Sequence, residues 1–103
     1  ADKTDTGISP MTIHKALALY LSGSEMDATQ LVHSAMKLLK DESNDLLYRI
    51  SIGIELIDYM LQTGNIEQAE KLIDQLHGLL EELPDSMQEP YNTRIVAIRQ
   101  AQN

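Results

Sequence analysis

Two stretches of the sequence align with each other without gaps, and this internal repeat constrains the fold more than any other feature. Residues 23–39 align on residues 64–80, so that each residue of the first stretch matches the residue 41 positions later. Gly23 and Gly64 open the two stretches. Because apolar residues then recur at every third or fourth position, each stretch predicts a helix that follows a turn. We therefore expect two related helical hairpins.

Aliphatic residues occupy matched positions throughout the repeat, including the segment before each glycine. The matched pairs are Ala28 and Ala69, Leu31 and Leu72, Val32 and Ile73, Leu38 and Leu79, Leu39 and Leu80, and, upstream, Ile13 and Ile54, Ala16 and Ile57, and Leu19 and Met60. A small residue after a turn allows two helices to cross closely, and the following aliphatic side chains fill the space between them. Because one hairpin cannot bury its apolar face alone, the two hairpins are expected to stack.

A chain of 103 residues, of which 43% are hydrophobic, is long enough for one domain with a modest core. The apolar spacing is helical almost throughout and no alternating stretch indicates a strand, so we expect an all-α fold. It should contain about five helices, arranged as two stacked antiparallel hairpins and a C-terminal helix. The expected divisions are a flexible N-terminal segment (1–8) and a single helical domain (9–103), made of hairpin one (9–42), hairpin two (43–83) and the C-terminal helix (84–103).

Capping and helix-breaking residues predict where the helices begin and end. Ser9 and Pro10 are typical of an N-cap followed by the first helical position. Pro84 should end the fourth helix, and a last helix should begin at Met87 or Pro90. The caps expected for the second, third and fourth helices are Ser24 or Asp27, Ser43 or Asn44, and Asn65.

Gly53 falls in the middle of the expected third helix, which should run from about Asp45 to Thr63. A glycine at such a position costs roughly 1 kcal/mol of helix stability relative to alanine. We expect close packing between helices to require it, and a small bend of the helix is the alternative.

Sixteen Asp and Glu residues against eight Lys and Arg residues give the chain a net charge of −8. Nucleic acids and anionic membranes are bound by Lys and Arg side chains that displace counterions, so we expect neither as a partner. No stretch approaches the roughly 20 apolar residues that a membrane span requires. Residues 1–9 are polar and contain no signal peptide, so we expect a cytoplasmic protein.

Residues that could carry chemistry occur singly. His14, His33 and His77 fall in three different expected helices, without the spacing of paired metal ligands. The chain has no cysteine, and the acidic run 41–45 lacks the glycine and the glutamate of a calcium-binding loop. It has neither a glycine-rich phosphate loop nor a nucleophile elbow, and its paired glutamates fall on helices expected to be solvated. We therefore expect no enzyme activity, no cofactor and no metal.

The five methionines recur at helical spacing, which is more typical of core packing than of an adaptable binding surface. They are Met11, Met26, Met36, Met60 and Met87. We expect them to fill gaps in the core, and a flexible contact surface is the alternative.

The repeat resembles tetratricopeptide-like (TPR-like) repeats over residues 9–83. The matching residues are Ala16, Gly23, Ala28 and Ala35 in the first unit and Leu56, Gly64, Asn65, Ala69, Ile73 and Leu76 in the second. The repeat departs from the family pattern in its spacing, which exceeds the usual length of about 34 residues, and in its missing aromatic residue, whose place is taken by Thr12 and Gly53. Small TPR-like chaperones of bacterial secretion systems are similar in size and acidity, which implies a chaperone or adaptor.

In TPR-like geometry the first helix of each hairpin lines a concave face, which implies a binding groove here. An aliphatic groove with a few polar positions accepts an amphipathic helix through spaced apolar anchors. The residues expected to line it are Ile13, His14, Leu17, Tyr20, Leu21, Ile54, Asp58, Leu61 and Gln62.

The first helix carries two apolar stripes, although a two-layer hairpin hides only one. Ile13, Leu17 and Leu21 form one of them at a spacing of four residues. An exposed second stripe would be a contact surface. We expect it to be covered by the C-terminal helix, by a second copy of the chain in a homodimer, or by a partner helix.

Three functions follow from these features. The first is a non-enzymatic protein-interaction module, an adaptor or chaperone that holds a partner helix or peptide in its groove. The second is an acidic inhibitor or immunity-type protein that covers a basic site of a toxin or enzyme. The third is part of a longer helical solenoid. Negative charge gathered on one face would favour the second, and a C-terminal helix that covers Leu17 and Leu21 would weaken the first.

Overall fold

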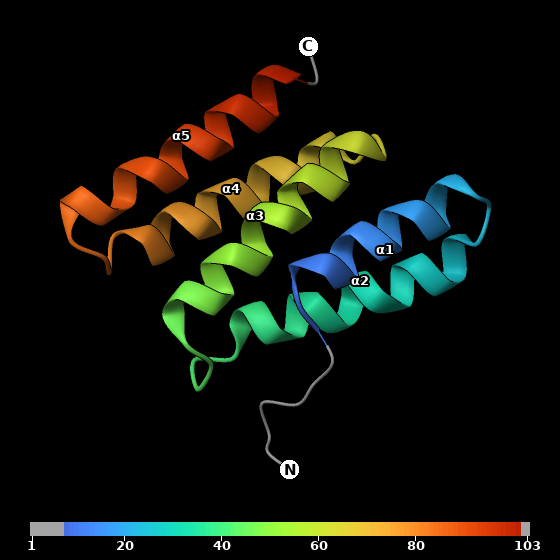
Figure 1. Ribbon diagram of the computed structural model, residues 1–103, viewed down its shortest axis with the longest axis horizontal. Helices are drawn as coiled ribbons and strands as arrows, with labels where there is room; N and C mark the ends of the chain where they lie inside the picture. Colours follow the sequence, from blue (N-terminus) through green and yellow to red (C-terminus); the bar gives the residue numbers. More distant parts are fainter. Residues whose placement is uncertain (1–7, 102–103) are drawn as a thin grey trace.

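The structure is a computed structural model in which residues 8–101 are described, and these residues form five α-helices (Figure 1). The all-α prediction with five helices is therefore confirmed. The flexible segment expected at the N-terminus lies outside the described residues, apart from Ile8. The helices are α1 (Pro10–Leu21), α2 (Glu25–Lys40), α3 (Leu46–Gln62), α4 (Ile66–Leu80) and α5 (Asp85–Ala101).

The helices pack as two hairpins followed by one helix, as expected. Helix α1 packs on α2 to form hairpin one, and α3 packs on α4 to form hairpin two. Helix α3 contacts each of the other four helices, whereas α5 lies against α3 and α4 (Figure 1). Ten of the 17 residues of α3 are buried, so α3 is the centre of the core.

The two hairpin turns have the same backbone hydrogen bonds, so the turns that open the two repeat stretches are alike in structure. In the first turn, Gly23 N–H donates to the carbonyl of Tyr20 and Ser24 N–H to that of Leu19. In the second, the N–H groups of the matched residues donate to the matched carbonyls, at 3.3 and 2.8 Å. Each turn is a Schellman motif, whose C′ residue adopts a positive φ that glycine tolerates best. Gly23 and Gly64 have φ values of 101° and 84°.

Gly53 lies where α2 and α4 approach α3, as expected from close packing. A Cβ atom at this position would lie 2.7 Å from Cδ1 of Leu76 on α4 and 3.3 Å from Cδ1 of Leu39 on α2. The shorter distance is below van der Waals contact, so a side chain larger than hydrogen would displace Leu76. The helix cost of the glycine is thus offset by the close approach of two leucines.

Two helix starts differ from those expected. Helix α3 begins after Asp45, whose carboxylate accepts hydrogen bonds from the N–H groups of Leu47 and Tyr48, so the predicted caps Ser43 and Asn44 are wrong. Asn44 donates instead to the carbonyl of Leu38 at 3.1 Å.

Helix α5 begins at Asp85, earlier than Met87 or Pro90, because the carbonyl of Pro84 accepts hydrogen bonds from the N–H groups of Met87 and Gln88. Pro90 therefore lies inside α5 rather than at its start. Pro90 lacks the N–H that would bond to the carbonyl of Ser86 four residues earlier, so α5 has one backbone hydrogen bond fewer at this point.

The connection between the hairpins is held by polar contacts to the end of α2. Arg49 is 9% exposed, and its Nε–H donates to the carbonyl of Leu39 at 2.9 Å. Hydrogen bonds from the hydroxyl and the N–H of Ser43 lower the pKa of Asp41, which is fully exposed. The Arg49 bond satisfies a carbonyl of the last turn of α2, which a helix end leaves without an intrahelical partner.

Candidate functional site

The nine residues expected to line a groove differ widely in their exposure. Three of the aliphatic residues belong to the core: Ile13, Ile54 and Leu61 are 2%, 0% and 8% exposed. These three side chains support the surface of α1 and α3 from beneath and are out of reach of a partner in this conformation. Of the remaining six, Leu17, Tyr20 and Asp58 are half-buried and His14, Leu21 and Gln62 are exposed.

Glu55 links three helices across the expected groove. Its Oε1 atom lies 3.0 Å from Nε2 of His14 on α1, and its Oε2 atom accepts a hydrogen bond from Arg94 on α5 at 3.1 Å. The Glu55 side chain is 13% exposed, whereas those of His14 and Arg94 are more than half exposed. His14 and Glu55 are a matched pair of the repeat. The centre of this surface is therefore polar rather than aliphatic.

The remaining expected residues on α3 and α1 contact each other or the core. Gln62 donates to Oδ2 of Asp58 at 3.0 Å, one helical turn away. The ring of Tyr20 meets that of Tyr59 edge-on, with 6.1 Å between their centroids. Burial raises the pKa of the Tyr59 phenol, and the neighbouring Tyr20 and Glu25 raise it further. Tyr20 is thus held by a packing contact between α1 and α3.

The C-terminal helix does not cover the stripe on α1. Within residues 8–101, α5 packs on α3 and α4 and has no contact with α1. Leu17 packs against the core, but Leu21 is 69% exposed at the end of α1. Of the stripe that the sequence indicates, the accessible part is therefore the end near the α1–α2 turn.

A groove that the sequence analysis did not identify lies between α2 and α4. It has a volume of about 390 Å³, and its base is formed by Met60 of α3. Within the described residues the backbones of α2 and α4 do not approach each other closely, so the groove is the space that α3 leaves between them. Its walls are Thr29, Val32, His33 and Met36 on α2 and Gln68, Lys71, Leu72 and Gln75 on α4.

Methionines contribute to this groove and lie exposed elsewhere, so the expectation that they fill the core is wrong for most of them. Met60 alone is buried, and Met36 is half-buried in the groove wall. Met26 is 78% exposed on α2, in a shallow hollow that shares Thr29 with the groove. Met11 and Met87 are exposed elsewhere, on α1 and α5. Thioethers on a surface adapt to partners of irregular shape.

The sequence does contain a signal for the groove. Thr29, His33 and Met36 recur at helical spacing on α2 and form a face of mixed polarity. Val32 and Leu72 were expected to pack in the core as repeat matches. Leu72 does so, at 2% exposure, although it also reaches the groove wall. Only the distance between α2 and α4 shows that this face borders a hollow.

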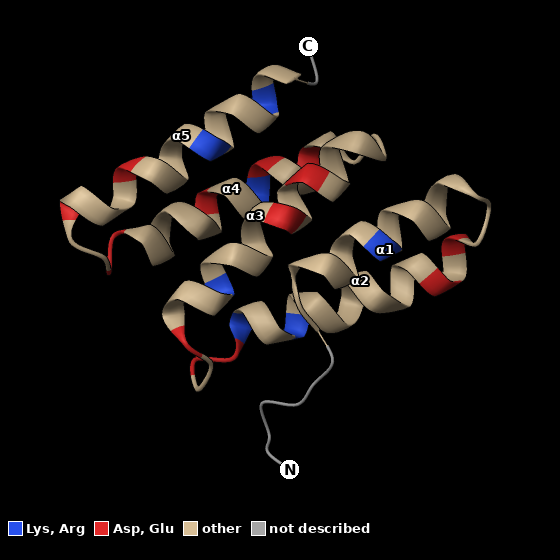
Figure 2. Cartoon of the chain, viewed as in Figure 1, with Lys and Arg blue, Asp and Glu red and all other residues tan. Residues whose placement is uncertain are grey.

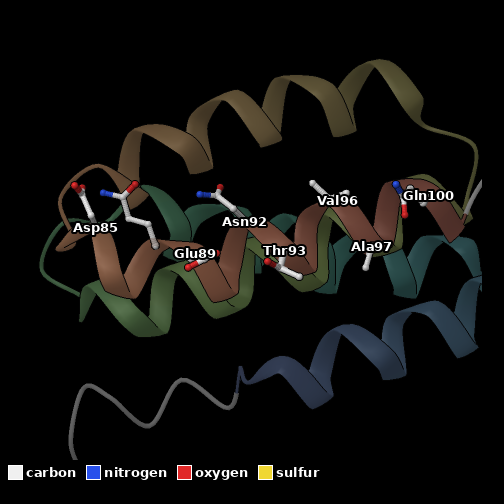
Figure 3. A pocket seen from close by; sticks show the side chains of 8 residues that line it. Asp85, Glu89, Asn92, Thr93, Val96, Ala97 and Gln100 are labelled. Atoms are coloured by element: carbon white, nitrogen blue, oxygen red, sulfur yellow. The ribbon is translucent and has the colours of Figure 1, made fainter.

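A second hollow runs along the outer side of α5 and has a different character. All the residues that line it come from α5, and Figure 3 shows their side chains in a row along the helix. Apart from Val96 and Ala97 they are polar: Asp85, Gln88, Glu89, Asn92, Thr93 and Gln100. A polar outer face is typical of a helix that caps a stack of repeats. Because one helix supplies the whole lining, this hollow has no second wall that could hold a partner helix.

Acidic residues occur on several elements of the described chain rather than on one helix or connection. Figure 2 shows them on α2, α3, α4 and α5 and in the connections before α3 and α5, whereas α1 carries only a basic residue, Lys15.

Comparison with known proteins gives no family model, no curated protein and no solved structure that matches this chain. Among residues 8–101, no group of three or more His, Asp or Glu side chains is arranged to hold a metal ion. None of the helices in that range has the length and apolar character needed to cross a membrane.

Proposed function

We propose that the protein is a non-enzymatic interaction module, of the adaptor or chaperone type, which holds an amphipathic helix or peptide of a partner protein. The observation that carries this proposal is the groove between α2 and α4, with Met36 and Met60 in its surface and Met26 beyond its end. A helix docks into such a groove through apolar side chains spaced by three or four residues. The paired hairpins and the matched turns support a divergent TPR-like architecture for the module.

The groove is a better candidate for the docking surface than the face formed by α1 and α3. The latter is crossed by the row His14, Glu55 and Arg94, and three of its expected anchors are buried. The groove presents thioether and aliphatic groups that are at least partly accessible, namely Val32 and Met36. The α1–α3 surface remains a prediction, and Leu21 provides a test of it in the same assay.

The partner can be captured by a photo-crosslinking residue placed at Gln75, an exposed residue of the groove wall. The same crosslinker at Thr93, an exposed residue of the α5 hollow, is the control. We expect a partner protein to be captured in host cells from the first position and not from the second. Equal capture from both positions would show that the contact is not specific to the groove.

The affinity for the captured partner then tests the surface directly. Thr29→Trp fills the groove, and Thr93→Trp makes the same change in the α5 hollow. We expect the first variant to weaken binding at least tenfold, or about 1.4 kcal/mol, and the second to leave the affinity unchanged. If Leu21→Asp abolishes binding while Thr29→Trp does not, the docking surface is α1 and the groove proposal fails.

A further inference from the structure

The walls of the α2–α4 groove differ in charge from the rest of the molecule. Their ionisable residues are Lys71 on α4 and His33 on α2, and none of the nine residues that line the groove is an Asp or a Glu. The chain as a whole has twice as many acidic as basic residues. An amphipathic segment in this groove would therefore meet a cation on one wall and an imidazole on the other, with no carboxylate in the lining.

We infer that the groove takes an amphipathic helix whose apolar anchors are flanked by carboxylates. This inference rests on the proposed function and adds the chemistry of the partner. The apolar side chains of the helix would contact Val32 and Met36, which are half-buried, and a flanking Glu or Asp would pair with the Lys71 ammonium group. The uncharged wall residues Thr29, Gln68 and Gln75 can bond to other polar groups of the same segment.

The groove also limits the length of the contact. Thr29 and Met36, the first and last lining residues on α2, are separated by two helical turns, or about 10 Å. A docked helix would therefore place two or three apolar anchors in the groove. Its flanking carboxylates would lie at the rim, where charge complementarity selects between partners.

The methionines make this inference testable by NMR, because the methyl groups report separately on the groove and on the rest of the surface. With the whole chain labelled with ¹³C at its methionine methyls, Met36 and Met60 report on the groove. Met11 and Met87 report on other surfaces. The probes are three synthetic 18-residue helical peptides with leucines at the same positions and Glu, Gln or Lys at all the others.

We expect the Glu peptide to shift the resonances of Met36 and Met60 and to leave those of Met11 and Met87 in place. Lys71→Glu should weaken this peptide about fivefold, as for loss of an exposed ion pair. Lys15→Glu changes the net charge by the same amount on α1, away from the groove, and should weaken it by less than twofold.

The possible failures are distinguishable. If the Gln or Lys peptide shifts the groove methyls at lower concentration than the Glu peptide, the inferred charge preference is wrong and the groove remains a docking site. Equal effects of Lys71→Glu and Lys15→Glu would also overturn the charge preference. If no peptide shifts Met36 or Met60, neither the inference nor the groove as a helix-docking site stands.

Discussion

The two hairpins differ in which of their helices carries the larger side chain at one pair of matched positions. In hairpin two, Gly53 of α3 leaves room for Leu76 of α4, whose Cδ1 would lie 2.7 Å from a Cβ atom at position 53. The matched positions of hairpin one hold Thr12 and Ala35, so that the larger side chain is on the first helix instead of the second. The same pair of matched positions is therefore filled by different residues in the two hairpins.

A second difference between the hairpins comes from their neighbours. Ile52, Leu56 and Tyr59 of α3 are buried. The matched residues of α1 are Met11, Lys15 and Ala18, which are exposed. Helix α3 is covered on this side by hairpin one, whereas no described helix covers α1 in the same way. A matched position is thus buried where another hairpin packs on it and exposed where none does.

The largest expected effect on this comparison is that of Leu76→Ala, which gives hairpin two the alanine of hairpin one without its threonine. Leu76 is fully buried, so the change leaves a cavity beside Gly53. We expect the free energy of unfolding to fall by about 2–5 kcal/mol. Urea denaturation followed by circular dichroism measures this free energy. If it fell no more than for a substitution at an exposed position, the crossing would be loosely packed.

Ala28→Leu and Ala69→Leu test whether the two hairpins are equivalent where they are most alike. Both alanines are fully buried, and leucine would overfill the space after each turn. Each variant should lose about 1–3 kcal/mol of unfolding free energy. Neutral behaviour at both positions would mean that the match in sequence does not reflect a match in packing.

The effect of Gly53→Ala on stability should depend on whether Leu76 is present. In the original background the new methyl group collides with Leu76, which offsets the gain in helix propensity. In a Leu76→Ala background that contact is absent, and alanine should stabilise the protein by up to about 1 kcal/mol. A double-mutant cycle measures the difference between the two backgrounds. Identical effects in both would show that Leu76 does not restrict position 53.

The smallest expected effect concerns Tyr59, which is buried where the matched Ala18 is exposed. Burial raises the pKa of the phenol in the folded state, so the neutral form favours folding. This contribution is fully present below the unfolded-state pKa of about 10 and is lost as the pH rises through the folded-state value. Relative to Tyr59→Phe, the unfolding free energy of the original protein should fall above about pH 10. Parallel pH profiles of the two proteins would contradict this.

The helices and their pairing were predictable because their signals are local. Gly23 and Gly64 mark Schellman turns, and the apolar spacing on either side shows which segments are helical. The N-cap of α3 was harder to predict because Ser43, Asn44 and Asp45 are all capable of capping. The choice depends on Asn44 reaching back to the end of α2.

The candidate site was less predictable because it depends on how the hairpins stack. Helix α3 is apolar on most of its surface, so its sequence does not show that Ile54 and Leu61 would be covered. The groove exists because α2 and α4 lie apart above Met60, and the apolar pattern of a single helix does not predict the distance between two helices. The partners of Glu55 were likewise not predictable, because His14 lies 41 positions before it and Arg94 lies 39 positions after it.

The central position of α3 has a consequence for how the molecule unfolds. Within residues 8–101, the backbone of hairpin one approaches the remainder only at α3, which is also the helix that α4 and α5 pack against. Loss of hairpin one would bring the buried side of α3 into water and so weaken its other contacts. Although the sequence contains a repeat, we expect the two hairpins to unfold as one cooperative unit. They should melt in a single transition rather than hairpin by hairpin.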